Sequence, residues 1–215
     1  MSKVYMYVVA RDFGFAPNPF HGYCTLATCK PVIRKKAKIG DWVVGMGGAR
    51  LKATGRCIFA MRVTEKLTFN EYWSNPKFLD KRPVRNGSRK MMVGDNIYYF
   101  DKEAGEWHQA DSHHSNPDGS FDRFNLERDT QSDSVLASEH FFYFGSDAPP
   151  VPKAMLTKLW YKNQRSHRVF EDTEAGRLVG WIENSFRGSL NQVSGDPFDF
   201  GESQKRYSAG TNRVR

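Results

Sequence analysis

The chain has 215 residues, of which 39% are hydrophobic and 14% aromatic, so it can bury one sizeable core. No apolar run approaches the roughly 18 residues of a membrane span, the first residues lack a cleavable leader pattern, and three cysteines are too few for a disulfide scaffold. These features exclude a membrane protein and a secreted scaffold and predict a cytoplasmic protein, and the net charge of +8 favours a phosphate-bearing partner.

The first half of the chain reads as strands joined by turns. Residues 4–9 place Val4, Met6 and Val8 on one face and Tyr5, Tyr7 and Val9 on the other, which predicts a strand. The Gly, Pro and Asn of residues 13–22 predict an ordered loop. A Gly-Asp turn precedes a short apolar strand at residues 42–46, and residues 56–65 alternate as a half-buried strand. Thr68 and Glu71 have the spacing of a capping box, which predicts a helix.

The second half is less regular. Residues 96–101 predict a strand, and SVLASEHFFYFG at residues 134–145 is the last strand expected. A helix is predicted over residues 173–186, with an apolar stripe of Leu178, Trp181 and Ile182. These elements predict an α+β fold, a curved β-sheet or barrel with packed helices, in a single domain over residues 1–200 with a disordered tail at 201–215.

Basic residues gather in three segments. Such clusters favour contact with a polyanion, although solvated surface faces would give the same composition. Two segments supply the expected contacts with a nucleic-acid backbone, namely Arg34, Lys35, Lys36, Arg82, Arg85, Arg89 and Lys90. The third and looser segment contains Lys158, Lys162, Arg165, His167 and Arg168.

Three longer segments carry a family resemblance, and they are residues 14–45, MVGDNIYYF at 92–100 and SVLASEHFFYFG at 134–145. Together they resemble the bacterial and phage family called nucleotide modification associated domain, type two. The order of strand, long loop, Gly-Asp turn and strand is also similar to the PUA-like folds that include the EVE, ASCH and YTH domains. The first resemblance covers about residues 4–200 and implies a role around modified bases in DNA. It implies DNA and other proteins of a modification or restriction system as partners, in the setting of phage defence.

The long loop after the first strand is rich in aromatic residues. Unstacked bases are held against aromatic faces, so this loop predicts a base pocket, while simple packing of the loop over one end of the sheet is the structural alternative. The residues expected in the pocket are Phe13, Phe15, Asn18, Phe20, Tyr23 and Trp42.

The same loop is followed by two of the three cysteines. A reactive cysteine needs a nearby base, which predicts Cys24 as nucleophile with His21 and with Asp95 as proton carrier, Asp129, Glu139 and His140 being further candidates. A mixed metal site of His21, Cys24 and His113 or His114 is conceivable, but no CxxC pair is present, so neither a metal nor a cofactor is predicted. Burial as small hydrophobic residues is the alternative for Cys24, Cys29 and Cys57.

Three functions are compatible with these patterns. In the first, favoured here, the protein binds nucleic acid and recognises a modified or flipped base. In the second, it is an enzyme that hydrolyses or hydrates a base substituent, for example on a 7-deazaguanine-type base. In the third, it is a structural subunit of a modification complex. Which base is bound, and whether the polymer is DNA or RNA, stays open.

Overall fold

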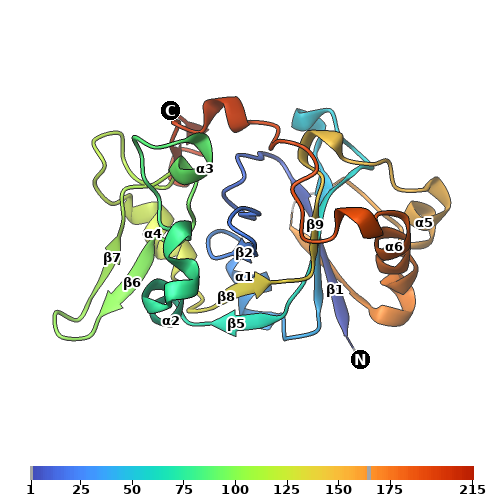
Figure 1. Ribbon diagram of the computed structural model, residues 1–215, viewed down its shortest axis with the longest axis horizontal. Coiled ribbons are helices and arrows are strands. Elements are labelled where there is room, and N and C mark those ends of the chain that lie inside the picture. The colour runs from blue at the N-terminus through green and yellow to red at the C-terminus, as the bar shows by residue number, and fades with distance from the viewer. Residues whose placement is uncertain (1, 164–165) are drawn as a thin grey trace.

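A mixed five-stranded sheet forms around the first strand (Figure 1). In the computed structural model, which describes residues 2–163 and 166–215, the strand order is β10-β1-β3-β4-β9, and β1 runs parallel to β3 but antiparallel to β10. These strands are β1 (Lys3–Val9), β3 (Trp42–Gly47), β4 (Cys57–Arg62), β9 (Phe141–Tyr143) and β10 (His167–Glu171). Gly45 of β3 is required because a Cβ there would lie 2.1 Å from the Phe59 ring.

Three smaller sheets complete the strand structure of the described residues. A three-stranded sheet has the order β2-β8-β5, and two antiparallel pairs are formed by β6 with β7 and by β11 with β12. The strands are β2 (Cys24–Leu26), β5 (Glu65–Leu67), β6 (Tyr98–Asp101), β7 (Glu106–Gln109), β8 (Val135–Ser138), β11 (Tyr207–Ser208) and β12 (Arg213–Val214).

Short helices flank the sheets. They are α1 (Pro31–Lys36), α2 (Phe69–Ser74), α3 (Arg89–Met92), α4 (Arg123–Asp129), α5 (Lys153–Lys158) and α6 (Asp172–Ser185), with 3-10 turns at Ala49–Leu51, Pro76–Lys81, Gly145–Asp147, Arg187–Ser189 and Phe200–Glu202. In Figure 1, α5 and α6 lie at the right beside the large sheet, and α2, α3 and α4 lie at the left with β6 and β7. Among the described residues, no helix combines the length and apolar character needed to cross a membrane.

Two hydrophobic clusters form the interior. The first joins β1, β3 and β4 to one face of α6, and the second joins the aromatic side chains of α2 and β6 to the loop after β1. Tyr7 and Val9 belong to the first cluster, whereas Phe13 and Phe15 belong to the second. The segment from Tyr7 to Phe15 therefore passes from one cluster to the other, and a cavity lies along this passage.

The α+β class, the capping box at Thr68 and the helix near residues 173–186 are confirmed. The barrel is not: within the described residues the strands form separate open sheets. The single strand expected at residues 134–145 is wrong, because Glu139 and His140 interrupt it and its halves, β8 and β9, enter different sheets.

Residues 201–215, expected to be disordered, form part of the folded structure. The Tyr207 amide donates to the His113 carbonyl over 2.7 Å, Asn125 donates to the Tyr207 carbonyl over 2.6 Å, and Arg206 forms an ion pair with Asp111. Polar residues that indicate disorder in the sequence therefore serve as hydrogen-bonding groups between distant segments.

Candidate active site

A cavity of about 300 Å³ lies where the two hydrophobic clusters meet. Its lining comes from the end of β1 and the loop that follows, from the turn after β2, from the segment before α4, from α4 itself and from β11. The lining residues include Tyr7, Arg11, Phe13, Phe15, Cys29, Lys30, His113, His114, Arg128 and Tyr207. Such a volume suits a small planar ligand, and the cavity holds the one half-buried thiol of the chain.

Cys29 occupies a turn of unusual backbone conformation. Its φ angle is 57° and that of Lys30 is 41°, so two consecutive non-glycine residues lie in the left-handed region, directly before Pro31 begins α1. The buried Arg34 side chain holds this turn in place, because its Nε donates to the Cys29 carbonyl over 2.8 Å. The other two nitrogens of the guanidinium donate to the carbonyls of Ser132, Ser134 and Asp129. Strain of this kind occurs where the surroundings over-determine a functional position.

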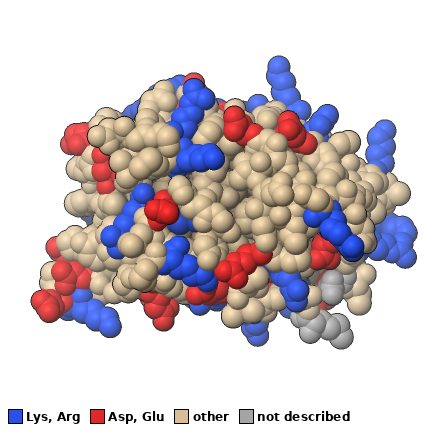
Figure 2. Space-filling view, in the orientation of Figure 1, with Lys and Arg blue, Asp and Glu red and all other residues tan. Residues whose placement is uncertain are grey.

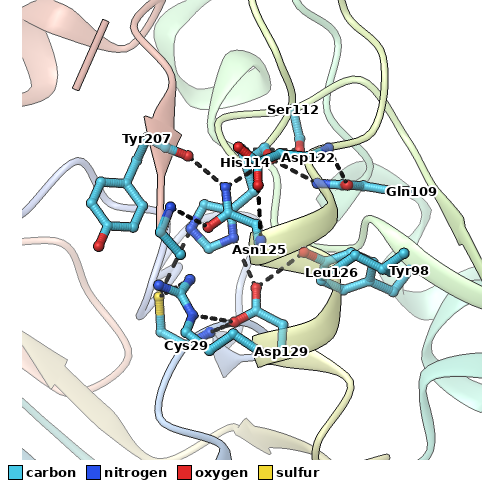
Figure 3. A network of polar contacts seen from close by, with 12 residues as sticks. Cys29, Tyr98, Gln109, Ser112, His114, Asp122, Asn125, Leu126, Asp129 and Tyr207 are labelled. Carbon is cyan, nitrogen blue, oxygen red and sulfur yellow. Dashed lines mark hydrogen bonds and ion pairs between the residues drawn. The ribbon is translucent and has the colours of Figure 1, made fainter. Parts of the chain in front are cut away.

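His114 and Asp129 lie next to the thiol (Figure 3). The His114 Nε2 atom is 3.9 Å from the Cys29 Sγ, and the His114 Nδ1 atom is 2.8 Å from the Asp129 Oδ2. Because a carboxylate only accepts, Nδ1 carries the proton and Nε2 faces the sulfur as a base. The three side chains thus form a cysteine-histidine-aspartate arrangement, which is the geometry of nucleophilic catalysis.

The Asp129 carboxylate at the end of α4 is held by several donors. Its Oδ2 also accepts from the Tyr98 hydroxyl over 3.1 Å, and its Oδ1 accepts from the Cys29 amide over 2.9 Å and from the Arg128 Nε over 3.2 Å. Burial alone would raise the pKa of Asp129, but His114 and Arg128 outweigh it and hold that pKa well below its ordinary value. Asp129 therefore stays charged and orients both the imidazole and the Cys29 turn.

Arg128 sets the charge state of the thiol. Its Nη2 lies 3.6 Å from the Cys29 Sγ. Burial alone would raise the pKa of Cys29, but the Arg128 guanidinium and the hydrogen bond with His114 outweigh it, so this pKa lies below its ordinary value. For His114 burial would lower the pKa, yet Asp129 outweighs that effect and raises it. Both directions favour a thiolate-imidazolium pair.

The cavity favours an anionic ligand. Arg11, Lys30 and Arg128 line it, and none of the described lining residues is acidic. The Tyr207 ring of β11 lies 5.2 Å from the Arg11 guanidinium and 5.5 Å from that of Arg128, which are cation-π distances. Tyr207 thus spaces two cations along the wall, where a phosphate group would contact them.

Two aromatic residues and a neutral histidine form the opposite part of the lining. The Phe13 and Phe15 rings lie 4.4 Å and 5.1 Å from the His113 ring. Burial lowers the pKa of His113 to about 3, and its Nδ1 lies 2.7 Å from the Lys205 carbonyl. Because a carbonyl only accepts, Nδ1 carries the proton and Nε2 is left as an acceptor for a ligand N–H group.

Tyr7 contributes a hydroxyl group without a partner. The side chain is 3% exposed, and its hydroxyl has no hydrogen-bond partner among residues 2–163 and 166–215. Burial, and next the charge on Cys29, raise the pKa of Tyr7 well above its ordinary value, so it remains a proton donor. The Lys30 Nζ lies 4.4 Å from the centre of the same ring. A buried unpaired hydroxyl beside a nucleophile is suited to bind an oxygen of the substrate.

The residues expected to be catalytic occupy other surroundings. Cys24 of β2 is 0% exposed, and burial raises its pKa to about 12. Asp95 is also 0% exposed and accepts from the hydroxyls of Tyr72 and Thr25, each over 2.7 Å, whereas His21 is exposed on its turn. These environments favour a structural role for Cys24 and Asp95, since a thiol of such pKa is not a nucleophile at neutral pH.

The expected base pocket is brought together only in part. Phe13 and Phe15 line the cavity, but the other four expected residues do not. Asn18 is buried and donates to the Val93 carbonyl, Phe20 stacks on Phe200, Tyr23 packs on Phe78, and Trp42 packs on His140. Strand β3, which carries Trp42, contributes no lining residue, and β1 supplies that part of the lining instead.

The expected phosphate contacts separate into buried and exposed residues. Arg34 is 0% exposed and bonded to carbonyl groups, so its assignment as a phosphate contact is wrong. Arg82 donates to the Trp73 carbonyl and Arg85 donates to the carbonyls of Met92, Ser203 and Gln204, which makes both largely structural. The exposed members are Lys35, Lys36, Arg89 and Lys90, and Arg165 of the third basic segment lies outside the described residues.

Several residues of this site were expected in other roles from the sequence. Asp129 was a possible proton carrier, His114 a possible metal ligand and Cys29 a buried hydrophobic residue, while Arg128 was not singled out. In the described part of the chain, no three His, Cys, Asp or Glu side chains are arranged to hold a metal ion. The usable signal was the Cys-Lys-Pro turn before α1, but the 85 residues from Cys29 to His114 leave no local pattern.

The three cysteines should differ in reactivity. We expect iodoacetamide at pH 7 to alkylate Cys29 about tenfold or more faster than Cys24 or Cys57, because its thiolate is stabilised whereas burial raises the pKa of the other two to about 12. Peptide mass spectrometry after timed labelling measures the three rates. Arg128→Gln should slow the labelling of Cys29, and equal rates for all three thiols in the folded protein would contradict this account.

Fold and site together define an α+β protein with a cysteine-histidine-aspartate site in a cationic, aromatic cavity. The chain belongs to the family of the nucleotide modification associated domain 2, whose family model matches residues 1–204. Neither the curated proteins nor the solved structures contain a match, and the PUA-like resemblance is not confirmed. Membership in this family associates the chain with DNA modification. The matched residues include Cys29, His114 and Asp129, whereas Tyr207 lies beyond them.

Proposed function

We propose that the protein is a cysteine-dependent enzyme that recognises a nucleotide base in the cavity and processes a substituent on it. The observation that carries this proposal is the Cys29 thiol, half-buried in the cavity and aligned with His114 and Asp129. Recognition of a base, expected from the sequence, becomes the binding step of this reaction. The substrate class is a nucleotide whose base bears a carbonyl-type substituent, such as an amide.

The chemistry follows from the protonation states. His114 Nε2 takes the proton of Cys29, and the thiolate attacks the carbonyl carbon of the substituent. The bond to the base nitrogen breaks, the nitrogen takes the proton from His114, and a thioester remains on Cys29. His114 then removes a proton from water, which attacks the thioester and releases a carboxylic acid and the free thiol. The net reaction is hydrolysis of the substituent.

Substrate binding is supported by three parts of the lining. Arg11 and Lys30 offer cations to a phosphate group, Phe13 and Phe15 offer apolar ring faces to a base, and His113 offers a hydrogen-bond acceptor to its N–H edge. A neutral, apolar ligand would offer these two cations no negative charge, and none of the described lining residues offers one either. The lining therefore favours a nucleotide over a free base.

The proposal is tested on nucleosides. DNA bearing base substituents, and the same DNA without them, are incubated with the purified protein, digested and analysed by mass spectrometry. We expect a mass loss that corresponds to the substituent, together with a transient adduct on the peptide that contains Cys29. Unchanged nucleosides, with salt-sensitive binding that prefers the modified DNA, would instead support a protein that recognises the base without altering it.

The unpaired hydroxyl of Tyr7 gives a sharper prediction. Tyr7→Phe should lower kcat by about a hundredfold, because the hydroxyl can stabilise the negative charge that develops on the carbonyl oxygen, and it should leave KM within about twofold. Steady-state kinetics measures both constants. Tyr99→Phe on β6, remote from the cavity, is the matched control and should be neutral. An unchanged kcat for Tyr7→Phe would exclude this role.

A further inference from the structure

An exposed tryptophan borders two grooves on the side of the molecule that carries α5. Trp160 is 78% exposed and has a φ angle of 48°, a left-handed conformation that is costly for a bulky side chain. One groove of about 520 Å³ lies between Trp160 and the residues Lys158, Arg168 and Arg177. The other, of about 450 Å³, is lined by Trp160 together with Lys153 and Lys162. Trp160 therefore stands between two basic depressions.

The charged side chains that line the two grooves, among those the structure describes, are all basic. Lys153, Lys158 and Lys162 are exposed, and none of the described residues that line the two grooves is acidic. Figure 2 shows Lys and Arg side chains along the right edge of the molecule, around the position of α5 in Figure 1. Arg168 also donates to the carbonyls of Leu159 and Trp160, and so holds the turn that presents the indole.

This surface adjoins the candidate active site. A small hollow of about 10 Å³ shares lining residues with both: Tyr7 and Val8 also line the active-site cavity, and Lys162 and Arg168 each also line one of the grooves. The antiparallel pairing of β1 with β10 causes this adjacency, because it sets Tyr7 opposite His167. The cations of the cavity and those of the grooves therefore form one strip across the edge of the large sheet.

We propose that this strip binds single-stranded nucleic acid that continues from the nucleotide held in the cavity. A base stacks on Trp160, and phosphates contact the exposed Lys158 and Lys162, while Arg168 holds the turn that presents the indole. An exposed indole between basic grooves suits unpaired bases, whose ring faces are free, better than a duplex, which buries them. The inference rests on the proposed function for the nucleotide in the cavity, and it specifies the substrate as a polynucleotide rather than a free nucleotide.

Binding to a fluorescein-labelled 12-nucleotide single strand, followed by fluorescence anisotropy, tests this proposal. We expect Trp160→Ala to raise Kd about tenfold or more and to leave the cleavage of a free nucleotide substrate unchanged. Phe121→Ala removes another exposed aromatic side chain, 58% exposed and outside the strip, and should leave Kd unchanged.

The salt dependence gives a second readout. Joint replacement of Lys158 and Lys162 by Gln should reduce the slope of log K against log salt by about 1.4, since each single-strand phosphate contact contributes about 0.7. Lys102→Gln, at the exposed turn between β6 and β7, is the control and should leave the slope unchanged.

Unchanged binding by Trp160→Ala, or equally tight binding of a duplex of the same sequence, would overturn the proposal. Its failure is distinguishable from that of the enzyme proposal. If free nucleotides are processed but single strands do not bind, the proposal that the strip binds nucleic acid is refuted and the proposed enzyme function is retained. If strands bind through Trp160 and no substrate is processed, strand binding by the strip is retained and the proposed enzyme function is refuted. Cys29→Ala should bind the strand as the unmodified protein does.

Discussion

Replacement of Cys29 by alanine should lower turnover of the modified nucleotide by about a thousandfold or more, because no other group in the cavity can form the thioester. The change removes a half-buried sulfur at the cavity wall, so the fold should be retained. Nucleoside mass spectrometry measures the remaining activity, and urea unfolding measures the stability. Retention of turnover by this variant would remove Cys29 from the mechanism.

The matched control is Cys24→Ala. The Cys24 side chain, at the start of β2, is 0% exposed, and burial raises the pKa of its thiol to about 12. We expect the opposite pattern, namely activity per folded molecule within about twofold of the unmodified protein and some loss of stability from the small cavity left in the core. A loss of turnover in Cys24→Ala alone would return the nucleophile to the position that the sequence favoured.

The second large effect should come from Arg34. Arg34→Gln should destabilise the protein by about 3 kcal/mol or more, because it removes a fully buried guanidinium and leaves the carbonyls of Cys29, Ser132, Ser134 and Asp129 short of donors. Two of these carbonyls belong to Cys29, the proposed nucleophile, and to Asp129, whose carboxylate orients the histidine. The denaturant midpoint and the slope of the unfolding curve measure the change.

Lys35→Gln serves as its control, since Lys35 is the next residue of α1 and is exposed. The control should alter the free energy of unfolding by no more than about 0.5 kcal/mol. A cost below about 1 kcal/mol for Arg34→Gln would show that the Cys29 turn is held by other contacts. In that case the unusual backbone of Cys29 and Lys30 would need a different origin.

Local patterns in the sequence predicted local structure well. The strands β1 and β4, the capping box of α2 and the apolar stripe of α6 depend on neighbours in the chain, and their positions were confirmed. The expectation that β4 is half-buried was wrong, because five consecutive residues, Cys57 to Met61, are buried on both faces of the strand. The break at Glu139 was missed, because a run of apolar residues reads as one strand whether or not its two ends enter the same sheet.

The candidate site was harder to predict because its parts come from distant segments. Cys29 and Asp129 are 100 residues apart, and the buried Arg34 donates to the backbone carbonyls of both. In the sequence Arg34 looked like a member of a basic surface cluster, whereas its side chain is 0% exposed. The exposure of an arginine and the pKa of a cysteine are set by tertiary neighbours, which no spacing along the chain encodes.

The wall formed by Tyr207 has a consequence for how specificity can change. The nucleophile, its base and its carboxylate lie within residues 1–204, which the family model matches, whereas the ring that spaces Arg11 and Arg128 lies outside them. Under the proposed function, the reacting groups therefore lie within the matched residues, whereas one ring of the cavity wall lies beyond them. Under the proposed function, side-chain substitutions in the β11-β12 hairpin that keep the backbone bonds of Tyr207 to His113 and Asn125 should change the preference for the nucleotide more than the rate of the thiol chemistry.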